Sequence, residues 1–205
     1  MSVHTRLSPL AATARLLSRR ANPGLPGLWF VTDPARTPDP VATVAQLPRG
    51  SAVIFRAFGA TDAVELGRAL RQATRKAGVL LLAGADSALA RRIGADGIHL
   101  PERLAHRAGQ LRRARPGSLV TAAAHDAAAI RKARRAGAQA VLVSPVFPSR
   151  SPSAGRPLGV LRFQALARGA GVPVVALGGI NSRTARRLKG TCAAGLAAVE
   201  GVTAP

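Results

Sequence analysis

Cysteine, aromatic side chains and long apolar runs are all scarce in this sequence. The single cysteine, Cys192, excludes a disulfide framework and a cysteine-rich metal site. No apolar run has the length needed to cross a bilayer, so we expect no membrane partner. No segment has the long apolar core and small-residue cleavage site of a secretion signal, which makes the cytoplasm the expected location.

Acidic residues are also few. The sequence has 30 basic residues, mostly arginine, against 9 acidic residues, which gives a formal net charge of +21. Such a charge attracts polyanions and is typical of nucleic-acid-binding surfaces. The arginines are spread over every predicted helix, however, and aromatic residues for base stacking make up only 3% of the chain. We therefore expect no nucleic-acid partner, and we interpret the charge as a compositional bias that also attracts phosphorylated small molecules.

A repeated unit of strand, turn, helix and glycine fills most of the chain. Its eight strand signals lie at residues 28–32, 51–56, 79–83, 97–100, 118–123, 140–144, 173–177 and 195–199. Continuous apolar strands joined by helices predict a parallel sheet covered on both faces, and eight of them predict an α/β fold of the (β/α)8 TIM barrel type. A doubly wound open sheet is the competing prediction. It requires a glycine-rich turn after the first strand, and Thr32-Asp33-Pro34 is not such a turn.

The two ends of the chain depart from this repeat. Few residues follow the last strand signal, so the last helix of the barrel is predicted to be reduced or absent. Residues 1–24 are basic and weakly amphipathic, which predicts an extra N-terminal helix across one end of the domain, with a targeting peptide as the alternative. We divide the chain into a helical extension, 1–27, and a barrel, 28–205. A homodimer is expected if a second subunit, and not the N-terminal helix, covers the open side.

Two glycine-containing loops are predicted to form a phosphate site. Gly178 and Gly179 follow the seventh strand, and Glu200 and Gly201 follow the eighth. Glycine lets an anion approach backbone N–H groups closely, and Asn181 predicts a helix N-terminus whose partial positive charge would add to the site. The alternative is that the glycine pair forms only a tight turn. Its place in the series favours a phosphate site, because barrels commonly bind phosphate after strands seven and eight.

Other candidate residues follow the ends of strands two, five and six. The Arg56 guanidinium can bind a carboxylate or phosphate through two hydrogen bonds, and pairing with a carboxylate at a neighbouring strand end is its alternative role. Ser149, Arg150 and Ser151 lie in the only long predicted loop, which either closes over a phosphate or forms a stiff, proline-flanked turn. His125 follows the fifth strand and is expected to point into the mouth of the barrel.

His99 lies inside the fourth strand signal. We expect it to be a polar residue at the barrel mouth that is satisfied by a hydrogen bond, with contact to a substrate as the lesser alternative.

Five of these segments resemble the thiamine phosphate synthase and thiazole tautomerase (TenI-type) superfamily. They are Leu-Trp-Phe-Val-Thr-Asp at 28–33, Val-Ile-Phe-Arg at 53–56, Gly-Ala-Asp-Gly-Ile-His at 94–99, Val-Ser-Pro-Val-Phe-Pro-Ser-Arg-Ser at 143–151 and Val-Val-Ala-Leu-Gly-Gly-Ile at 174–180. The resemblance covers residues 28 to about 201. It implies a small barrel of thiamine biosynthesis that acts on a phosphorylated thiazole. The synthase branch joins thiazole phosphate to a pyrimidine diphosphate with Mg²⁺, whereas the tautomerase branch moves a proton within a thiazole carboxylate phosphate without a metal.

The sequence departs from the synthase pattern where that branch binds Mg²⁺ and diphosphate. Of the Gln-x-Arg-x-Lys motif on strand two, only Arg56 remains. Ala85 and Leu104 stand where the resemblance implies two metal-binding aspartates. Asp86 and Glu102 lie within two residues of these positions and leave a shifted site as the alternative, but the strict register predicts no metal. The Thr-x-Thr-Lys loop of the synthases is 149–152 here, and it has lost its lysine.

The resemblance therefore favours metal-independent proton transfer on a phosphorylated thiazole, with no cofactor. His125 matches the histidine of the tautomerase branch on strand five, where the resemblance implies the proton transfer. Its alternative is a supporting or partly exposed residue, because some synthases also have histidine there. Glu200 stands where synthases have a small residue whose N–H touches the phosphate, so its carboxylate either turns away or acts as a base. The alternatives are a thiamine phosphate synthase, which would need Mg²⁺, and a non-catalytic phosphate-binding barrel that regulates or partners another enzyme.

Overall fold

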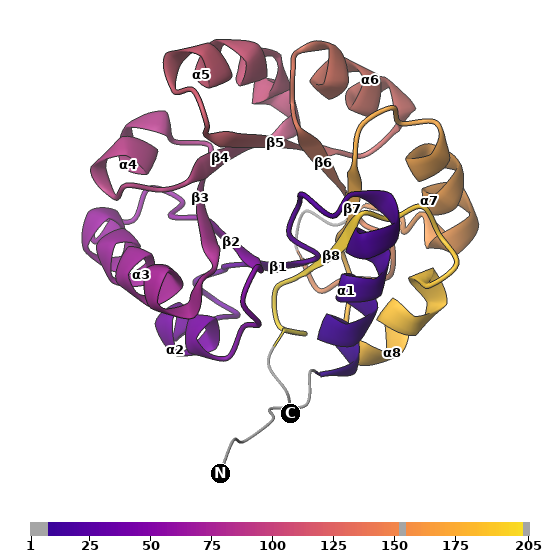
Figure 1. Ribbon diagram of the computed structural model, residues 1–205, viewed down its shortest axis with the longest axis horizontal. Coiled ribbons are helices and arrows are strands. Elements are labelled where there is room, and N and C mark those ends of the chain that lie inside the picture. The colour runs from indigo at the N-terminus through magenta and orange to yellow at the C-terminus, as the bar shows by residue number, and fades with distance from the viewer. Residues whose placement is uncertain (1–7, 152–154, 203–205) are drawn as a thin grey trace.

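The structure is a computed structural model that describes residues 8–151 and 155–202. Its eight strands form one closed barrel in which each strand is parallel to its neighbours and β8 pairs with β1 (Figure 1). The strands are β1 Leu28–Val31, β2 Ala52–Phe55, β3 Leu80–Gly84, β4 Gly97–Leu100, β5 Leu119–Ala124, β6 Ala140–Val143, β7 Val174–Ala176 and β8 Gly195–Ala198. The predicted (β/α)8 barrel is confirmed, and the open-sheet alternative is wrong.

The strands are continuously apolar because both faces of the barrel wall are buried. Side chains of one parity fill the barrel interior, and Trp29, Ile54 and Leu82 are among them with no exposed surface. Side chains of the other parity, such as Phe30, pack under the surrounding helices. The Trp29 indole N–H donates to the Pro26 carbonyl at 2.7 Å, which satisfies the one polar group of this buried side chain.

The helices surround the barrel (Figure 1), and side-chain caps begin several of them. Their bounds are α2 Pro40–Ala45, α3 Ala63–Ala77, α4 Ser87–Arg92, α5 Ala108–Ala114, α6 Ala127–Arg135, α7 Gly159–Arg168 and α8 Ser182–Ala185. Asp39, Asp86 and Asp126 accept hydrogen bonds from backbone N–H groups in the first turns of α2, α4 and α6.

Two predicted helices are shorter than expected. The segment 102–114 is a 3-10 helix, Glu102–Arg107, followed by α5. The segment 181–188 is the four-residue α8 followed by a 3-10 turn, Arg186–Leu188. No helix in the described part of the chain is both long enough and apolar enough to span a membrane.

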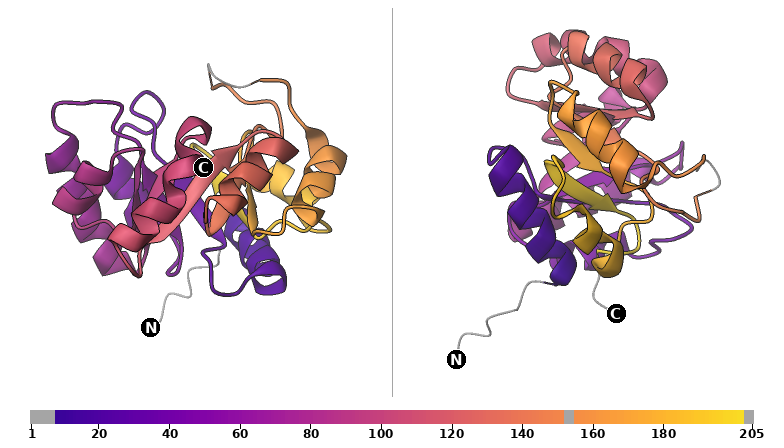
Figure 2. Two further views of the ribbon diagram at one scale, coloured as in Figure 1. Left: turned by 90° about the horizontal axis from the view of Figure 1, so that it is seen from above. Right: turned by 90° about the vertical axis from the view of Figure 1, so that its right-hand side faces the viewer.

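The N-terminal helix α1, Pro9–Ala21, takes the place of a helix after β8. It packs against α8, β8 and β1, and Leu10 and Leu17 are buried in these contacts (Figures 1 and 2). Gly27 lets the entry to β1 pass close to α1, since a Cβ there would lie 2.7 Å from the Ala14 carbonyl oxygen. The predicted extra helix is thus confirmed over the described residues, and residues 199–202, the described part after β8, contain no helix. Residues 1–7 of the predicted extension lie outside the described residues, and the division at residue 27 stays a prediction.

Candidate functional site

A cavity of about 610 Å³ lies at the carboxyl ends of the strands. The loops after β1, β2 and β5 to β8 all contribute to its lining. The nine residues predicted to act in catalysis or in substrate binding all line this one cavity: Arg56, His125, Ser149, Arg150, Ser151, Gly178, Gly179, Glu200 and Gly201. They converge because a parallel barrel brings the carboxyl ends of all its strands to one face. The structure therefore places them together, and the role of each stays a prediction.

The glycine pair packs against the loop that follows β6. Gly178 and Gly179 have φ values of +92° and +64°, which non-glycine residues rarely adopt. A Cβ on Gly178 would lie 2.7 Å from Pro145 Cα, and one on Gly179 would overlap the Pro148 carbonyl oxygen. Within residues 8–151 and 155–202, the N–H groups of Gly178 and Gly179 have no hydrogen-bond acceptor. The tight turn and the phosphate site are therefore compatible, because the turn leaves two amides available to an anion.

The predicted contribution of the following helix stays a prediction, and the structure limits how large it can be. The Asn181 side chain already accepts the N–H groups of Arg183 and Thr184, at 2.9 and 3.0 Å. The Thr184 hydroxyl returns the contact by accepting the Asn181 N–H and donating to the Gly179 carbonyl. This capping box uses two of the first N–H groups of α8 and leaves that of Ser182 without an acceptor in the described ranges, and a helix of four residues aligns few peptide dipoles. A full positive charge in this part of the cavity would therefore come from a side chain.

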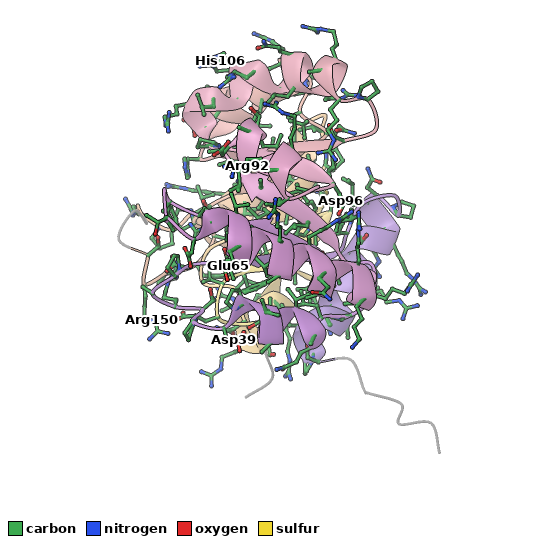
Figure 3. All side chains as sticks on the ribbon, turned by 90° about the vertical axis from the view of Figure 1, so that its left-hand side faces the viewer. Asp39, Glu65, Arg92, Asp96, His106 and Arg150 are labelled. Atoms are coloured by element: carbon green, nitrogen blue, oxygen red, sulfur yellow. The ribbon has the colours of Figure 1, made fainter. Side chains whose placement is uncertain are left out.

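The carboxylate of Glu200 pairs with Arg150. Arg150 Nη2 lies 2.9 Å from Glu200 Oε1, and the two side chains are 81% and 38% exposed. The pair joins the loop after β6 to the residues after β8. Arg150 lies at the opposite end of the barrel from Asp96, which precedes β4 (Figure 3). Within the loop, Ser149 Oγ accepts the Ser151 N–H at 3.3 Å. The Glu200 carboxylate thus has a cationic partner beside the predicted anion site, which offsets its repulsion of an anion.

Arg56 adopts the alternative role that the sequence left open. Its Nη2 lies 2.9 Å from Asp33 Oδ2, and its Nε donates to the Thr32 carbonyl at 2.7 Å. Asp33 also binds Arg36 at 2.9 Å, and this hydrogen bond, together with the charges of Arg36 and Arg56, lowers the pKa of the Asp33 carboxyl. Arg56 lines the cavity, but much of its hydrogen-bonding capacity is used by β1 and the residues that follow it.

His125 is oriented by a backbone carbonyl. Its Nδ1 lies 2.6 Å from the Ser144 carbonyl oxygen, and because a carbonyl only accepts, the proton of the neutral ring is on Nδ1. Nε2 is then the basic nitrogen, at 4.0 Å from Glu102 Oε2. That carboxylate oxygen is buried and has no hydrogen-bond partner in the described part of the chain. A histidine held this way can take and return a proton in the cavity.

His99 is the satisfied polar residue that the sequence predicted. Its Nδ1 lies 2.9 Å from the Thr121 hydroxyl. Burial, with a smaller contribution from the charge of Arg56, lowers the pKa of His99 to about 4. The ring is therefore neutral near pH 7.

Two cavity residues had no signal in the sequence. Arg36 and Arg187 both line the cavity, and the Arg187 guanidinium carbon lies 5.0 Å from the centre of the Phe147 ring. Arginines are frequent on every helix here, so no local pattern distinguishes these two from the solvated ones.

The carboxylates near the mouth do not fit the Mg²⁺ of the synthase branch. Asp86 caps α4 and accepts two backbone N–H groups, at 2.8 and 2.9 Å. Asp33 is bound by two arginines. Glu102 pairs only loosely with His125, and in the described ranges no three His, Cys, Asp or Glu side chains gather where they could share a metal ion. Mg²⁺ requires several oxygen ligands that are free to coordinate, and Glu102 Oε2, which no hydrogen bond occupies in the described ranges, does not make such a site by itself.

The fold and this cavity define a class: a (β/α)8 barrel that carries its site at the carboxyl ends of its strands, with glycine loops after strands seven and eight. Within this class the chain belongs to the thiamine monophosphate synthase (TMP-TENI) family, whose family model matches residues 28–202. The resemblance seen in the sequence is thereby confirmed.

Individual relatives carry the synthase name. The chain is 33% identical over 147 residues to the thiamine-phosphate synthase of Chloroflexus aurantiacus, covering 69% of this chain and 65% of that protein. It is 34% identical over 140 residues to the thiamine biosynthesis bifunctional protein ThiM/ThiE of Symbiobacterium thermophilum, covering 68% of this chain but only 29% of that protein. The chain thus spans less than two thirds of these relatives.

A solved structure gives the same picture. The thiamine phosphate pyrophosphorylase from Pyrococcus furiosus is 25% identical, with a TM-score of 0.71 over 84% of each chain. These names favour the synthase alternative over the proton-transfer interpretation that the sequence placed first.

Proposed function

We propose that this barrel binds the phosphorylated thiazole of thiamine biosynthesis, the substrate that the synthase and tautomerase branches share. The observation that carries the proposal is the convergence of the Gly178, Gly179 and Gly201 loops on one cavity, with two glycine amides that have no acceptor among the described residues. Val31, Leu177 and other apolar residues line the same cavity and offer a surface for a small heterocycle. One end of the cavity would thus bind the phosphate and the other the ring.

For the reaction, synthesis of thiamine phosphate is the first candidate. Several relatives of this chain are named thiamine-phosphate synthases, and the solved structure is named a thiamine phosphate pyrophosphorylase. In that reaction this chain's residues would bind and orient the thiazole half. The poor fit of the nearby carboxylates to Mg²⁺ makes binding of the pyrimidine diphosphate the step most in need of a test.

Proton transfer by His125 is the second candidate, and one observation favours it. The Ser144 carbonyl fixes the proton of the neutral ring on Nδ1, so that Nε2 is the nitrogen that can accept a substrate proton. A histidine suits this role because its ring can both accept and return a proton. This proton transfer would require no metal ion or cofactor.

A paired assay distinguishes the candidates. Thiazole phosphate and the pyrimidine diphosphate are mixed with the protein, with and without Mg²⁺, and diphosphate release is measured. In parallel, exchange of the substrate proton of a thiazole carboxylate phosphate with D₂O is followed by NMR for the wild type and for His125→Gln. Diphosphate release selects the synthase, and exchange that His125→Gln abolishes selects proton transfer. Thiazole phosphate binding with neither reaction selects the non-catalytic barrel, and failure to bind this ligand contradicts the proposal.

A further inference from the structure

We propose that Arg187 is the cation that binds the phosphate group in this cavity. This inference rests on the proposed function, because it assumes that the ligand is phosphorylated. Arg187 lies in the 3-10 turn after α8 and lines the cavity.

The charge inventory of the cavity singles out this arginine. Four arginines line it, namely Arg36, Arg56, Arg150 and Arg187. Arg36 and Arg56 share the Asp33 carboxylate, and Arg150 pairs with Glu200, each at 2.9 Å. Arg187 pairs with no carboxylate in residues 8–151 and 155–202. A cation that no carboxylate neutralises is the one best able to bind an incoming dianion.

The position of Arg187 also couples it to the glycine amides. Its guanidinium carbon lies 5.0 Å from the centre of the Phe147 ring, and Phe147 is only 3% exposed. The backbone N–H of Phe147 donates to the Gly178 carbonyl at 3.0 Å. One residue therefore supports the cation with its ring and the Gly178 turn with its backbone. An aromatic ring covers one flat face of a guanidinium and leaves the N–H groups at its edges free for phosphate oxygens.

Neighbouring groups do not supply this charge. The N–H groups of Arg183 and Thr184 at the start of α8 are bound by the Asn181 side chain. The amides of Gly178 and Gly179 offer hydrogen bonds but no full charge. A phosphate at these amides would gain a full positive charge only from a side chain. Arg36 and Arg56 keep a net charge of +1 between them, but both are bound to Asp33, whereas Arg187 is bound to no carboxylate in the described ranges.

Arg187→Gln is the test, and Arg183→Gln is its matched control. Arg183 is an exposed arginine of α8 that does not line the cavity, so its loss removes the same formal charge from the same segment. Calorimetric titration uses three ligands: thiazole phosphate, the corresponding thiazole alcohol and inorganic phosphate. For Arg187→Gln we expect affinity for thiazole phosphate to fall about 10- to 100-fold and affinity for the alcohol to stay within about twofold. Arg187→Lys should recover part of the loss, because lysine restores the charge without the planar fork.

The outcomes separate this inference from the proposed function. If the wild type binds thiazole phosphate and Arg187→Gln binds it as tightly as Arg183→Gln does, the inference is wrong and the proposed function stands. If the wild type binds only inorganic phosphate, and Arg187→Gln loses that binding, the thiazole assignment is wrong and the role of Arg187 stands. Circular dichroism and thermal unfolding check that each variant is folded. If Arg187→Gln does not fold, the comparison is repeated with Arg187→Lys.

Discussion

Replacing Gly178 by alanine should both destabilise the barrel and weaken the site. The new Cβ would lie 2.7 Å from Pro145 Cα and 2.8 Å from Pro145 Cβ, so the loop after β6 would have to move. The φ of +92° also disfavours any side chain at this position. Backbone strain of this kind costs about 1–3 kcal/mol, and overpacking costs about as much again. We expect the free energy of unfolding to fall by roughly 2–6 kcal/mol, or about 4–24 °C in Tm for a chain of this size.

Two other glycines separate the contributions. Gly59 has φ +79°, but a Cβ there would have no atom within 4 Å, so Gly59→Ala carries the strain alone. Gly190 has neither a positive φ nor a close neighbour, so Gly190→Ala should be neutral or stabilising by up to about 1 kcal/mol. The assay is thermal unfolding of the three variants, followed by titration with thiazole phosphate. The reasoning is refuted if Gly178→Ala is no less stable than Gly59→Ala, because the contact with Pro145 would then cost nothing.

Three further predictions concern stability. The pKa of His99 is about 4 in the folded chain and about 6.5 in the unfolded chain, so below about pH 6.5 protonation favours the unfolded state. The free energy of unfolding should therefore fall by at most about 3 kcal/mol as the pH drops from about 6.5 to 4. Urea unfolding of His99→Gln should lack this part of the wild-type pH dependence. Leu17→Ala should lower the unfolding free energy by about 2–5 kcal/mol, because Leu17 lies on the buried face of α1 and is only 1% exposed. A loss below about 1 kcal/mol in urea unfolding would show that α1 does not stabilise the barrel. Arg150→Ala should change Tm by less than about 4 °C, since exposed ion pairs contribute about 1 kcal/mol or less, and a larger shift in a thermal scan would contradict this account of the Arg150–Glu200 pair.

The sequence by itself determined the barrel and the place of the cavity. Strand segments such as 140–143 are continuously apolar because both faces of a barrel wall are buried, and this pattern is local. The helix starts at Asp86 and Asp126 are local too, because a cap bonds to N–H groups within the next three residues. Once eight such units are counted, the geometry of a parallel barrel brings all the strand ends to one face.

Only the tertiary structure decided which charges pair. Arg56 meets Asp33, 23 residues away, and Arg150 meets Glu200, 50 residues away. These pairs leave Arg187 as the lining arginine without a carboxylate among the described residues. The capping box of α8 occupies two of the N–H groups at the helix terminus that the sequence had favoured as a phosphate donor. Local sequence patterns encode backbone conformation and burial, whereas the partner of a long arginine side chain depends on which distant segments the closed barrel brings within its reach.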